Sequence, residues 1–246
     1  MSGHSKWATI KHAKGAADAK RGQMFTKLIK EISIAARMGG GNPEGNPRLR
    51  TAIIKARGAN MPKDNIDRAI KKGTGELEGV NYEELTYEAF LGGGVGLLIE
   101  VLTDNKNRAA ADVRNILTRG GGELAKAGSV SRLFKRLGVI TLDGEKYTED
   151  QIMEAALEGG AEDVSAQNGI VEVTSAPEDF EAVMEALNAK QFETMSAEIS
   201  MVAETEVSLD SEAAGKALKL IDRLEESDDV QNVYSNISIP DGFEAE

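Results

Sequence analysis

The chain has 246 residues, no cysteine, two histidines and a formal net charge of −12. This length suits two or three domains, and the lack of cysteine excludes disulfides and thiolate metal sites. His4 and His12 are the only histidines that could bind a metal, so we expect no metal site and no cofactor. No apolar run of about 18 residues occurs and the N-terminus lacks an apolar signal-peptide core, so we expect a cytoplasmic protein with no membrane span.

The charge is distributed very unevenly along the chain. Residues 1–75 carry 16 Lys+Arg against 5 Asp+Glu, residues 76–136 carry 8 against 9, and residues 137–246 carry 5 against 27. A strong local excess of basic residues indicates an acidic polymer as partner. The acidic total therefore conceals a basic segment that is suited to nucleic acid.

The basic segment divides into an arm and three helices. Residues 1–20 show only a weak helical pattern around a single tryptophan, which predicts a mobile arm that orders on binding. Residues 21–38 have apolar side chains at helical spacing and are followed by three glycines, which predicts an amphipathic helix. Two further short helices are expected, from Asn46-Pro47 to about Arg57 and from Pro62 to a stop at Gly73.

The remaining chain alternates strand and helix patterns. A hairpin is predicted from Tyr87–Leu91 and Val95–Leu102 around a triple glycine, followed by a helix over 108–118. Between residues 138 and 202 the order is βαββαβ, which is typical of a ferredoxin-like module. Its predicted strands are 139–142, 162–165, 170–174 and 198–202, and its predicted helices are 148–157 and 177–187. A last helix, about 211–226, and a strand over 230–237 have no sheet of their own, so we expect them to return to the hairpin.

These elements predict an α+β, multidomain fold. It comprises an N-terminal three-helix domain, a discontinuous middle α/β domain and an acidic ferredoxin-like module. The expected boundaries are 1–20 for the arm, 21–78 for the helical domain, 79–136 plus 205–240 for the middle domain, and 137–204 for the module.

Catalysis is not expected. Both histidines lie in the predicted mobile arm, a poor setting for preorganised acid–base chemistry, and the acids are scattered as on solvated helix faces. The glycine-rich stretches lack the strand context and the Gly-Lys-Ser/Thr element of phosphate-binding loops. No small-molecule substrate is evident, so we expect a protein that is not an enzyme.

The candidate site is instead a nucleic-acid interface. Basic side chains gain affinity for phosphates by counterion release, and an aromatic side chain in an arm can stack on an unpaired base. Lys20, Lys27, Lys30 and Arg37 fall within roughly 100° on the side of the first helix opposite its apolar face. The candidate residues are Lys6, Trp7, Lys11, His12, Lys14, Lys20, Arg21, Lys27, Lys30, Arg37, Arg48, Arg50, Lys55, Arg57, Lys63, Arg68, Lys71 and Lys72.

A second candidate basic loop follows the predicted helix over 108–118. A flexible loop with several cations could contact a phosphate backbone, although a helix stop followed by a solvated turn explains the glycines equally well. The candidate residues of this loop are Arg119, Lys126, Arg132, Lys135 and Arg136.

Several motifs resemble the YebC/PmpR family. They include Gly3-His4-Ser5-Lys6-Trp7, Asn46-Pro47-Arg48-Leu49-Arg50, Asn60-Met61-Pro62-Lys63-Asp64-Asn65-Ile66, Thr103-Asp104-Asn105 and Gly128-Ser129-Val130. The resemblance covers essentially the whole chain. It implies three domains and a cytoplasmic DNA-binding transcriptional regulator. Mitochondrial relatives are described as translational activators and bacterial members have been linked to ribosomes, so it implies no choice between DNA and RNA.

Three hypotheses therefore stay open. The first is a regulator that binds double-stranded DNA, although no helix-turn-helix recognition helix is evident in the sequence. The second is a ribosome-associated, RNA-binding translation factor, since a basic arm with one tryptophan suits structured or single-stranded RNA. The third is a protein-binding scaffold, in which the acidic module attracts basic partners.

Overall fold

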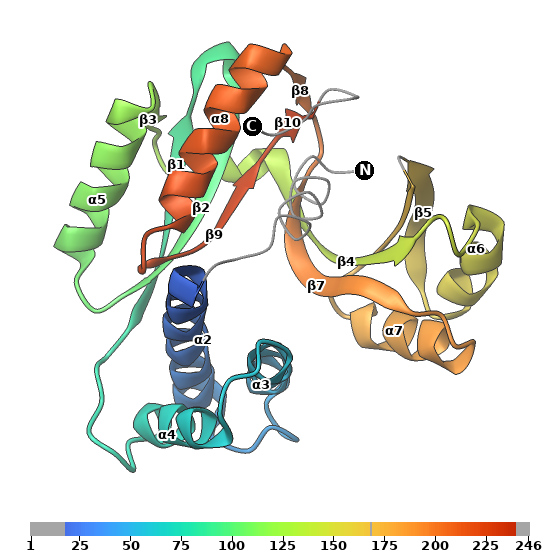
Figure 1. Cartoon of the computed structure of the whole chain (residues 1–246), viewed down its shortest axis with the longest axis horizontal. Helices are drawn as coiled ribbons and strands as arrows, with labels where there is room; N and C mark the ends of the chain where they lie inside the picture. The colour runs from blue at the N-terminus through green and yellow to red at the C-terminus, as the bar shows by residue number, and fades with distance from the viewer. Residues whose placement is uncertain (1–17, 168, 240–246) are drawn as a thin grey trace. The chain divides into compact units, whose positions relative to one another are not determined.

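Residues 18–167 and 169–239 are described by the computed structural model, in which helices and antiparallel sheets form an α+β, multidomain fold (Figure 1). They fall into two units. The bundle–sheet unit contains described residues 18–130 and 210–233, and the other unit contains described residues from 131–209 together with 234–239. The predicted arm over residues 1–20 lies almost wholly outside the described residues.

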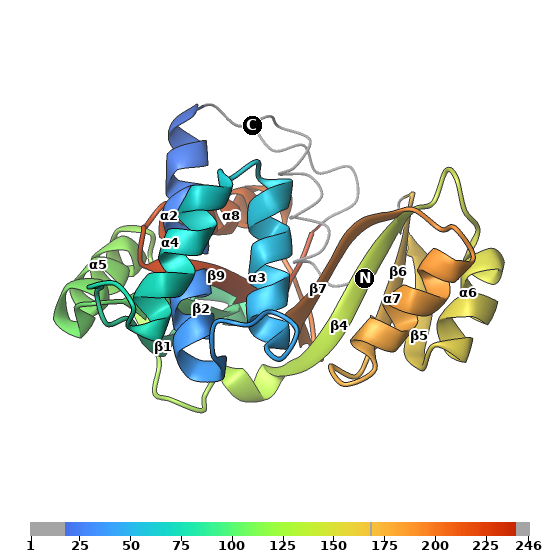
Figure 2. The ribbon, with the colours of Figure 1, turned by 90° about the horizontal axis from the view of Figure 1, so that it is seen from below.

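Three helices form the bundle, with α2 at Asp18–Gly39, α3 at Pro47–Gly58 and α4 at Lys63–Thr74 (Figure 2). Asn46 caps α3 by accepting a hydrogen bond from the Leu49 amide, and its own amide donates to the carbonyls of Ala35 and Gly40. One short side chain thus joins the end of α2 to the start of α3. The shared core consists of Ile32, Ala35, Ala36, Leu49, Ala52, Ile53, Ala56, Met61, Ile66 and Ala69.

Gly73 does not end the third helix as the sequence predicted. Helix α4 continues to Thr74, and Gly75 terminates it in a left-handed conformation with φ 83°. A Cβ atom on Gly73 would lie 2.2 Å from the carbonyl oxygen of Ser33 in α2. The glycine is therefore required for the close approach of two helices rather than for a helix stop.

The hairpin forms the centre of a four-stranded sheet. Strands β1 (Glu83–Phe90) and β2 (Gly96–Thr103) pair antiparallel around a 3-10 turn at Gly92–Gly94, and the strand order is β3-β1-β2-β9. The outer strands are β3 at Glu123–Leu124 and β9 at Val230–Ser235. The C-terminal strand therefore returns to the hairpin, as predicted. Helices α5 (Lys106–Arg119) and α8 (Ser211–Glu225) pack against each other beside this sheet (Figure 1).

The other unit has the predicted ferredoxin-like topology, and we call it the ferredoxin-like unit. Its elements follow the order βαββαβ, and its sheet has the order β5-β6-β4-β7 with antiparallel neighbours. The elements are β4 (Phe134–Asp143), α6 (Glu149–Glu158), β5 (Ala161–Gln167), β6 (Ile170–Ser175), α7 (Phe180–Ala189) and β7 (Thr194–Ala203). A 3-10 turn at Ser131–Leu133 precedes them, and β8 (Val207–Ser208) pairs in parallel with β10 (Ile237–Ser238).

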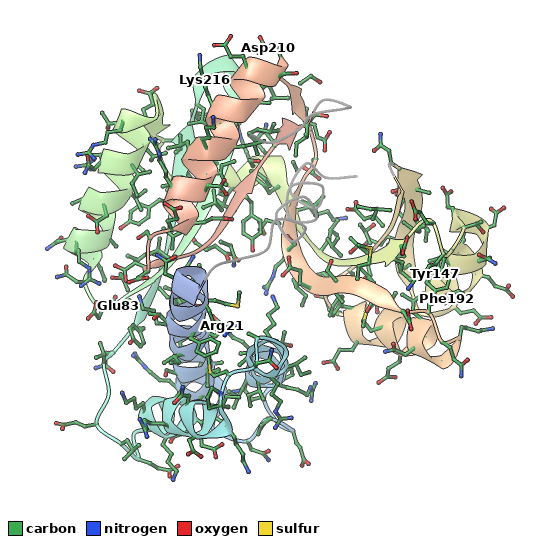
Figure 3. All side chains as sticks on the ribbon, viewed as in Figure 1. Arg21, Glu83, Tyr147, Phe192, Asp210 and Lys216 are labelled. Atoms are coloured by element: carbon green, nitrogen blue, oxygen red, sulfur yellow. The ribbon has the colours of Figure 1, made fainter. Side chains whose placement is uncertain are left out.

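Both helices of this unit cover one face of its sheet (Figures 1 and 2). Ile140, Val164 and Val173 point from three strands toward Ile152 of α6 and Val183 of α7 in a common core. Tyr147 and Phe192, labelled in Figure 3, meet edge to face with ring centroids 5.1 Å apart. The opposite face of the sheet carries the alternate side chains of each strand.

Candidate nucleic-acid interface

The predicted interface lies partly outside the described residues. Lys6, Trp7, Lys11, His12 and Lys14 belong to the segment that the structure does not describe, and so does the side chain of Lys20. Arg21, labelled in Figure 3, is exposed in the first turns of α2. The remaining candidates of the basic segment divide between side chains that hold the unit together and side chains that face solvent.

The basic side of α2 packs against the C-terminal end of α8 and the residues after it. Lys27 Nζ donates to the Glu225 carbonyl at 2.5 Å, and Gln23 Nε2 donates to the Glu226 carbonyl at 3.0 Å. These carbonyls end α8, where the helix dipole favours cations. Arg37, at the other end of α2, donates to Asn81 Oδ1 and to the Tyr82 carbonyl.

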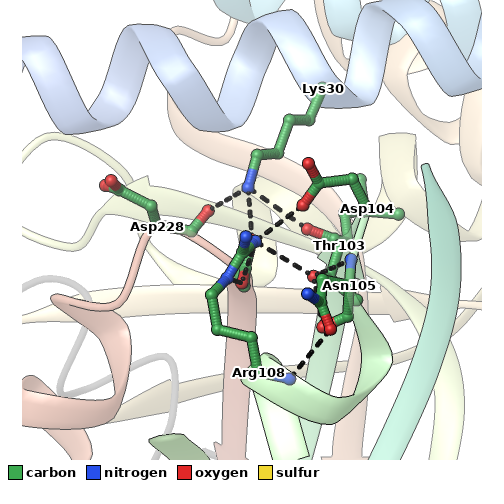
Figure 4. Close-up of polar contacts among 8 residues, drawn as sticks. Lys30, Thr103, Asp104, Asn105, Arg108 and Asp228 are labelled. Carbon is green, nitrogen blue, oxygen red and sulfur yellow. Dashed lines mark hydrogen bonds and ion pairs between the residues drawn. The ribbon is translucent and has the colours of Figure 1, made fainter. Parts of the chain in front are cut away.

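Lys30, a candidate on the side of α2 opposite the apolar face, is buried, with 7% of its surface exposed. Its ammonium lies 2.7 Å from Asp229 Oδ1 and also donates to the carbonyls of Asp228 and Leu102, at 2.8 and 3.3 Å (Figure 4). These three acceptors lie within the bundle–sheet unit. Lys30 therefore fixes the bundle to the sheet and is not available to a phosphate in this structure.

Asp229 is shared by two cations from different elements. Arg108, in the first turn of α5, donates to both Asp229 oxygens and to Asp104 (Figure 4). Burial by itself would raise the pKa of the Asp229 carboxyl, but the hydrogen bonds from Lys30 and Arg108 outweigh it and lower this pKa below its usual range. The charged form of Asp229 is thus the stable one in the folded protein.

Arg48 is also held within the unit. Its guanidinium donates to both carboxylate oxygens of Glu31, at 2.7 and 3.0 Å, and forms a further ion pair with Glu84. The hydrogen bond with Glu31 is the main cause that raises the pKa of Arg48. A bidentate pair of this kind joins α3 to α2, so Arg48 is better suited to fixing the bundle than to binding a ligand.

Five candidates form what we call the α3–α4 cationic set. They are exposed and, within the part of the chain that the structure describes, have no ion-pair or hydrogen-bond partner for their side chains: Arg57, Lys63, Arg68, Lys71 and Lys72. At about 100° per residue, Arg68, Lys71 and Lys72 share an arc of about 100° on the side of α4 away from its core residues. Arg50 and Lys55 of α3 extend the basic surface, although each already has an interaction within the chain.

Two acidic residues lower the positive charge of this surface. Asp64 and Asp67 are exposed on α4 and precede the basic last turn, which contains Lys71 and Lys72. An acidic first turn and a basic last turn both complement the helix dipole. The local excess of positive charge therefore lies toward the C-terminal half of α4.

The second candidate basic loop divides between the two units. Arg119 ends α5 and Lys126 lies in the loop after β3, whereas Arg132, Lys135 and Arg136 belong to the ferredoxin-like unit. Lys135 Nζ lies 3.4 Å from Glu162 Oε2, so this lysine already has an acidic partner. We retain the loop only as a prediction from the sequence.

Within the described ranges, no group of three or more acidic or histidine side chains is placed to hold a metal ion. Nor does any helix in those ranges have the length and apolar character needed to cross a membrane. The candidate site is therefore a basic helical surface on an ordered scaffold.

Residues 5–76 match the TACO1/YebC protein N-terminal domain, and residues 82–237 match the TACO1/YebC second and third domain. The chain belongs to the TACO1/YebC family. A relative from Treponema denticola, named a probable transcriptional regulatory protein, is 67% identical over 244 residues, which is 99% of each chain. A relative of the same name from Trichlorobacter lovleyi is 57% identical, covering 97% of this chain and 96% of its own.

A solved structure has a similar fold. The crystal structure of a conserved hypothetical protein from Aquifex aeolicus matches with a TM-score of 0.83 and 45% identity, covering 93% of this chain and 95% of that one. The resemblance drawn from the sequence motifs is therefore confirmed, and so is the α+β multidomain fold.

Sequence reasoning missed the acidic partners of the basic residues. Asp229 lies 199 positions from Lys30 in the chain, and no local pattern connects the two. One signal was present in the sequence: Ile34 follows Lys30 by one helical turn and is itself buried, with 6% of its surface exposed. An isoleucine on the same flank as the lysine indicates that this flank of the helix is covered.

Proposed function

We propose that the protein is a nucleic-acid-binding regulator of gene expression that acts in the cytoplasm and has no catalytic role. The relatives are named probable transcriptional regulatory proteins, which supports the regulatory part of the proposal. The observation that carries the binding part is the α3–α4 cationic set, whose exposed side chains have no partner among the described residues. When such side chains neutralise phosphates, counterions that had condensed on the nucleic acid are released, and this release favours binding.

The proposed interface consists of the α3–α4 cationic set together with the basic residues of segment 1–17. Lys30 and Arg48 are left out, because their charges are already satisfied by Asp229, Glu31 and Glu84. The helices would contact the phosphate backbone, and Trp7 would stack on an unpaired base where one is available. This division predicts that affinity resides in α4 and that the choice of polymer resides in the N-terminal segment.

The salt dependence of binding tests this proposal. The association constant of the full chain for a 30-base-pair duplex and for a structured RNA of similar length is measured against salt concentration. Replacing Lys71 and Lys72 with Gln should flatten the slope by about 0.9 for each lost contact with duplex DNA, or about 0.7 with single strands. A slope that stays the same in this variant contradicts the proposed interface.

A matched control comes from Lys216, which is exposed on α8 and paired with Glu212 at 2.7 Å. Because this lysine lies outside the proposed interface, Lys216→Gln together with Lys219→Gln removes the same charge without altering the slope. If both pairs of substitutions flatten the slope equally, binding follows net charge alone and has no defined site.

The second candidate is an RNA-binding translation factor associated with ribosomes. A helix-turn-helix protein reads bases with the first turn of its recognition helix, but α4 carries Asp64 in its first turn and its basic residues in the last. This arrangement favours backbone recognition of a folded RNA over insertion into the major groove. Crosslinking in cells, followed by sequencing of both DNA and RNA, separates the two candidates, and recovery of neither polymer contradicts both.

A further inference from the structure

The chain between α4 and β1 folds back on the bundle, and we call its residues 75–82 the returning segment. The Leu77 amide donates to the Lys71 carbonyl at 3.1 Å, so the chain reverses as soon as α4 has ended. A Cβ atom on Gly79 would lie 3.0 Å from the Cβ atom of Lys72, which shows how closely the segment passes over the helix. The returning segment is therefore packed against α4.

Arg37 of α2 holds the far end of the returning segment. Its Nη1 donates to Asn81 Oδ1 at 3.3 Å and to the Tyr82 carbonyl at 3.4 Å. The Lys30 ammonium lies 5.7 Å from the centroid of the Tyr82 ring, a distance at which a cation attracts an aromatic ring. The segment is thus attached to both α2 and α4.

A pocket of about 160 Å³ lies between the returning segment and these two helices, wholly within the bundle–sheet unit. Leu77, Val80 and Tyr82 line it from the segment, and Ile34 lines it from α2. A cavity of about 150 Å³ is large enough to hold a benzene ring. The pocket therefore has room for one six-membered ring, whereas two fused rings exceed it.

The apolar side chains that line the pocket are open to solvent. Leu77 is 43% exposed and Val80 is 55% exposed. Apolar and aromatic walls with a few polar groups are typical of sites for small ligands. A ring that enters the pocket removes these side chains from water, which favours binding, and a group attached to the ring stays outside.

Two cations line the same pocket. The side chain of Lys72 has no ion-pair or hydrogen-bond partner in the described part of the chain. Among the same residues Arg37 donates only through Nη1, so its other N–H groups are available to a ligand. The acids of the returning segment, Glu76 and Glu78, do not line the pocket. The pocket therefore suits a flat ring that carries an anionic group.

We propose that this pocket binds one unpaired pyrimidine nucleotide. Its base lies against Leu77 and Val80, and its phosphate meets Lys72 and Arg37. Asn81 Nδ2 donates no hydrogen bond within the described residues and is available to a carbonyl oxygen of the base. Because Lys72 belongs to the α3–α4 cationic set, the inference rests on the proposed function and names the nucleotide that this surface recognises.

Binding of labelled RNA hairpins to the full chain tests the inference. One hairpin carries a single bulged uridine, another a bulged adenosine, and a third is fully paired. The unaltered protein should bind the uridine bulge about tenfold more tightly than the paired hairpin, since stacking of one base contributes an effect of that order. Adenosine should gain less, because its two rings exceed the pocket. The same hairpins in DNA, with thymidine in place of uridine, show whether the sugar matters.

Replacing the two apolar walls separates the pocket from the rest of the surface. Leu77→Ser with Val80→Ser leaves the charge unchanged, so the preference for the bulged pyrimidine should be lost while the salt dependence of binding stays the same. The control is Met38→Ser with Ile54→Ser, which alters two apolar side chains outside the pocket, 67% and 62% exposed, and should keep the preference. Melting curves show that both variants fold.

The outcomes distinguish this inference from the proposed function. Equal affinity of the unaltered protein for bulged and paired hairpins, in RNA and in DNA, overturns the inference and leaves the proposed function in place. A preference that persists in the Leu77/Val80 variant assigns the base to another site, such as Trp7, and also overturns it. Equal loss in the control variant, or a larger gain for adenosine, has the same consequence. A protein that binds none of the hairpins refutes the proposed function and this inference with it.

Discussion

Replacing Asp229 with Asn should be among the most destabilising single changes in the bundle–sheet unit. The carboxylate is 5% exposed and accepts hydrogen bonds from Lys30 at 2.7 Å and from Arg108 at 2.9 Å. In this variant the ammonium of Lys30 stays buried without its counterion, and its acceptors among the described residues are two backbone carbonyls and the neutral amide oxygen at position 229. Leaving a buried charge without its counterion costs about 3–5 kcal/mol. Arg108 is about half exposed and adds little to this cost, so we expect a loss of about 3 kcal/mol.

Urea unfolding followed by circular dichroism measures this loss. The informative comparison is with Lys30→Met alone and with the double variant Lys30→Met/Asp229→Asn. Because the double variant buries no unmatched charge, it should be less destabilised than the sum of the two single variants. A loss below about 1 kcal/mol for Asp229→Asn, or strict additivity of the two changes, would refute the reasoning.

The same pair gives the stability a defined dependence on pH. Burial alone would raise the pKa of the Asp229 carboxyl, but the hydrogen bonds from Lys30 and Arg108 outweigh it, so the pKa in the folded protein lies below its ordinary value. A depressed pKa contributes stability that is fully present above the unfolded pKa and is lost as the pH falls through the folded one. The difference in unfolding free energy between the unaltered protein and Asp229→Asn should therefore be constant near neutral pH and shrink below about pH 4. A difference that persists unchanged at pH 2 contradicts this assignment.

Two further predictions concern α4. Gly73→Ala should destabilise the bundle by about 2 kcal/mol in thermal melts, because its Cβ would lie 2.2 Å from the Ser33 carbonyl oxygen. The control is Gly58→Ala in α3, whose Cβ would meet no atom within 4 Å and which should be neutral or slightly stabilising. Replacing Asp64 and Asp67 with Asn should tighten nucleic-acid binding at low salt and lose this effect at high salt, and equal or weaker binding by this variant would show that α4 does not face the polymer.

Local sequence patterns were enough to place most elements. Asn46 accepts a hydrogen bond from the backbone at the start of α3, as its position before a proline and an apolar periodic segment indicated. The βαββαβ order also predicted the sheet of the ferredoxin-like unit, since few arrangements of that order bury both helices. These features depend on residues close together in sequence, and sequence alone reaches them.

The return of the last strand to the hairpin was predicted although its partners are distant in sequence, but several other features that depend on distant partners were not. Strand β4 begins at Phe134 rather than at Val139, because Lys135 and Arg136 interrupt the apolar pattern while their backbones still pair with β7. The two-residue strands β3 and β8 carry no pattern at all. The basic side of α2 was predicted to bind nucleic acid because Asp229, the counterion of Lys30, lies near the far end of the chain and no local pattern connects the two.

The position of a cation within the fold thus matters more than the net charge of its segment. Residues 1–75 contain an excess of basic residues, yet two of them form ion pairs within the chain: Lys30 with Asp229, and Arg48 with Glu31 and Glu84. Holding Lys30 and Arg48 in these ion pairs orients α2 and α3, while Lys71 and Lys72 in the last turn of α4 stay exposed. The internal ion pairs and the exposed cations are therefore parts of one arrangement, in which the first set fixes the surface that the second set presents. A variant that breaks the Lys30–Asp229 pair should accordingly weaken binding by loosening the bundle, whereas a variant at Lys71 should weaken it without any loss of stability.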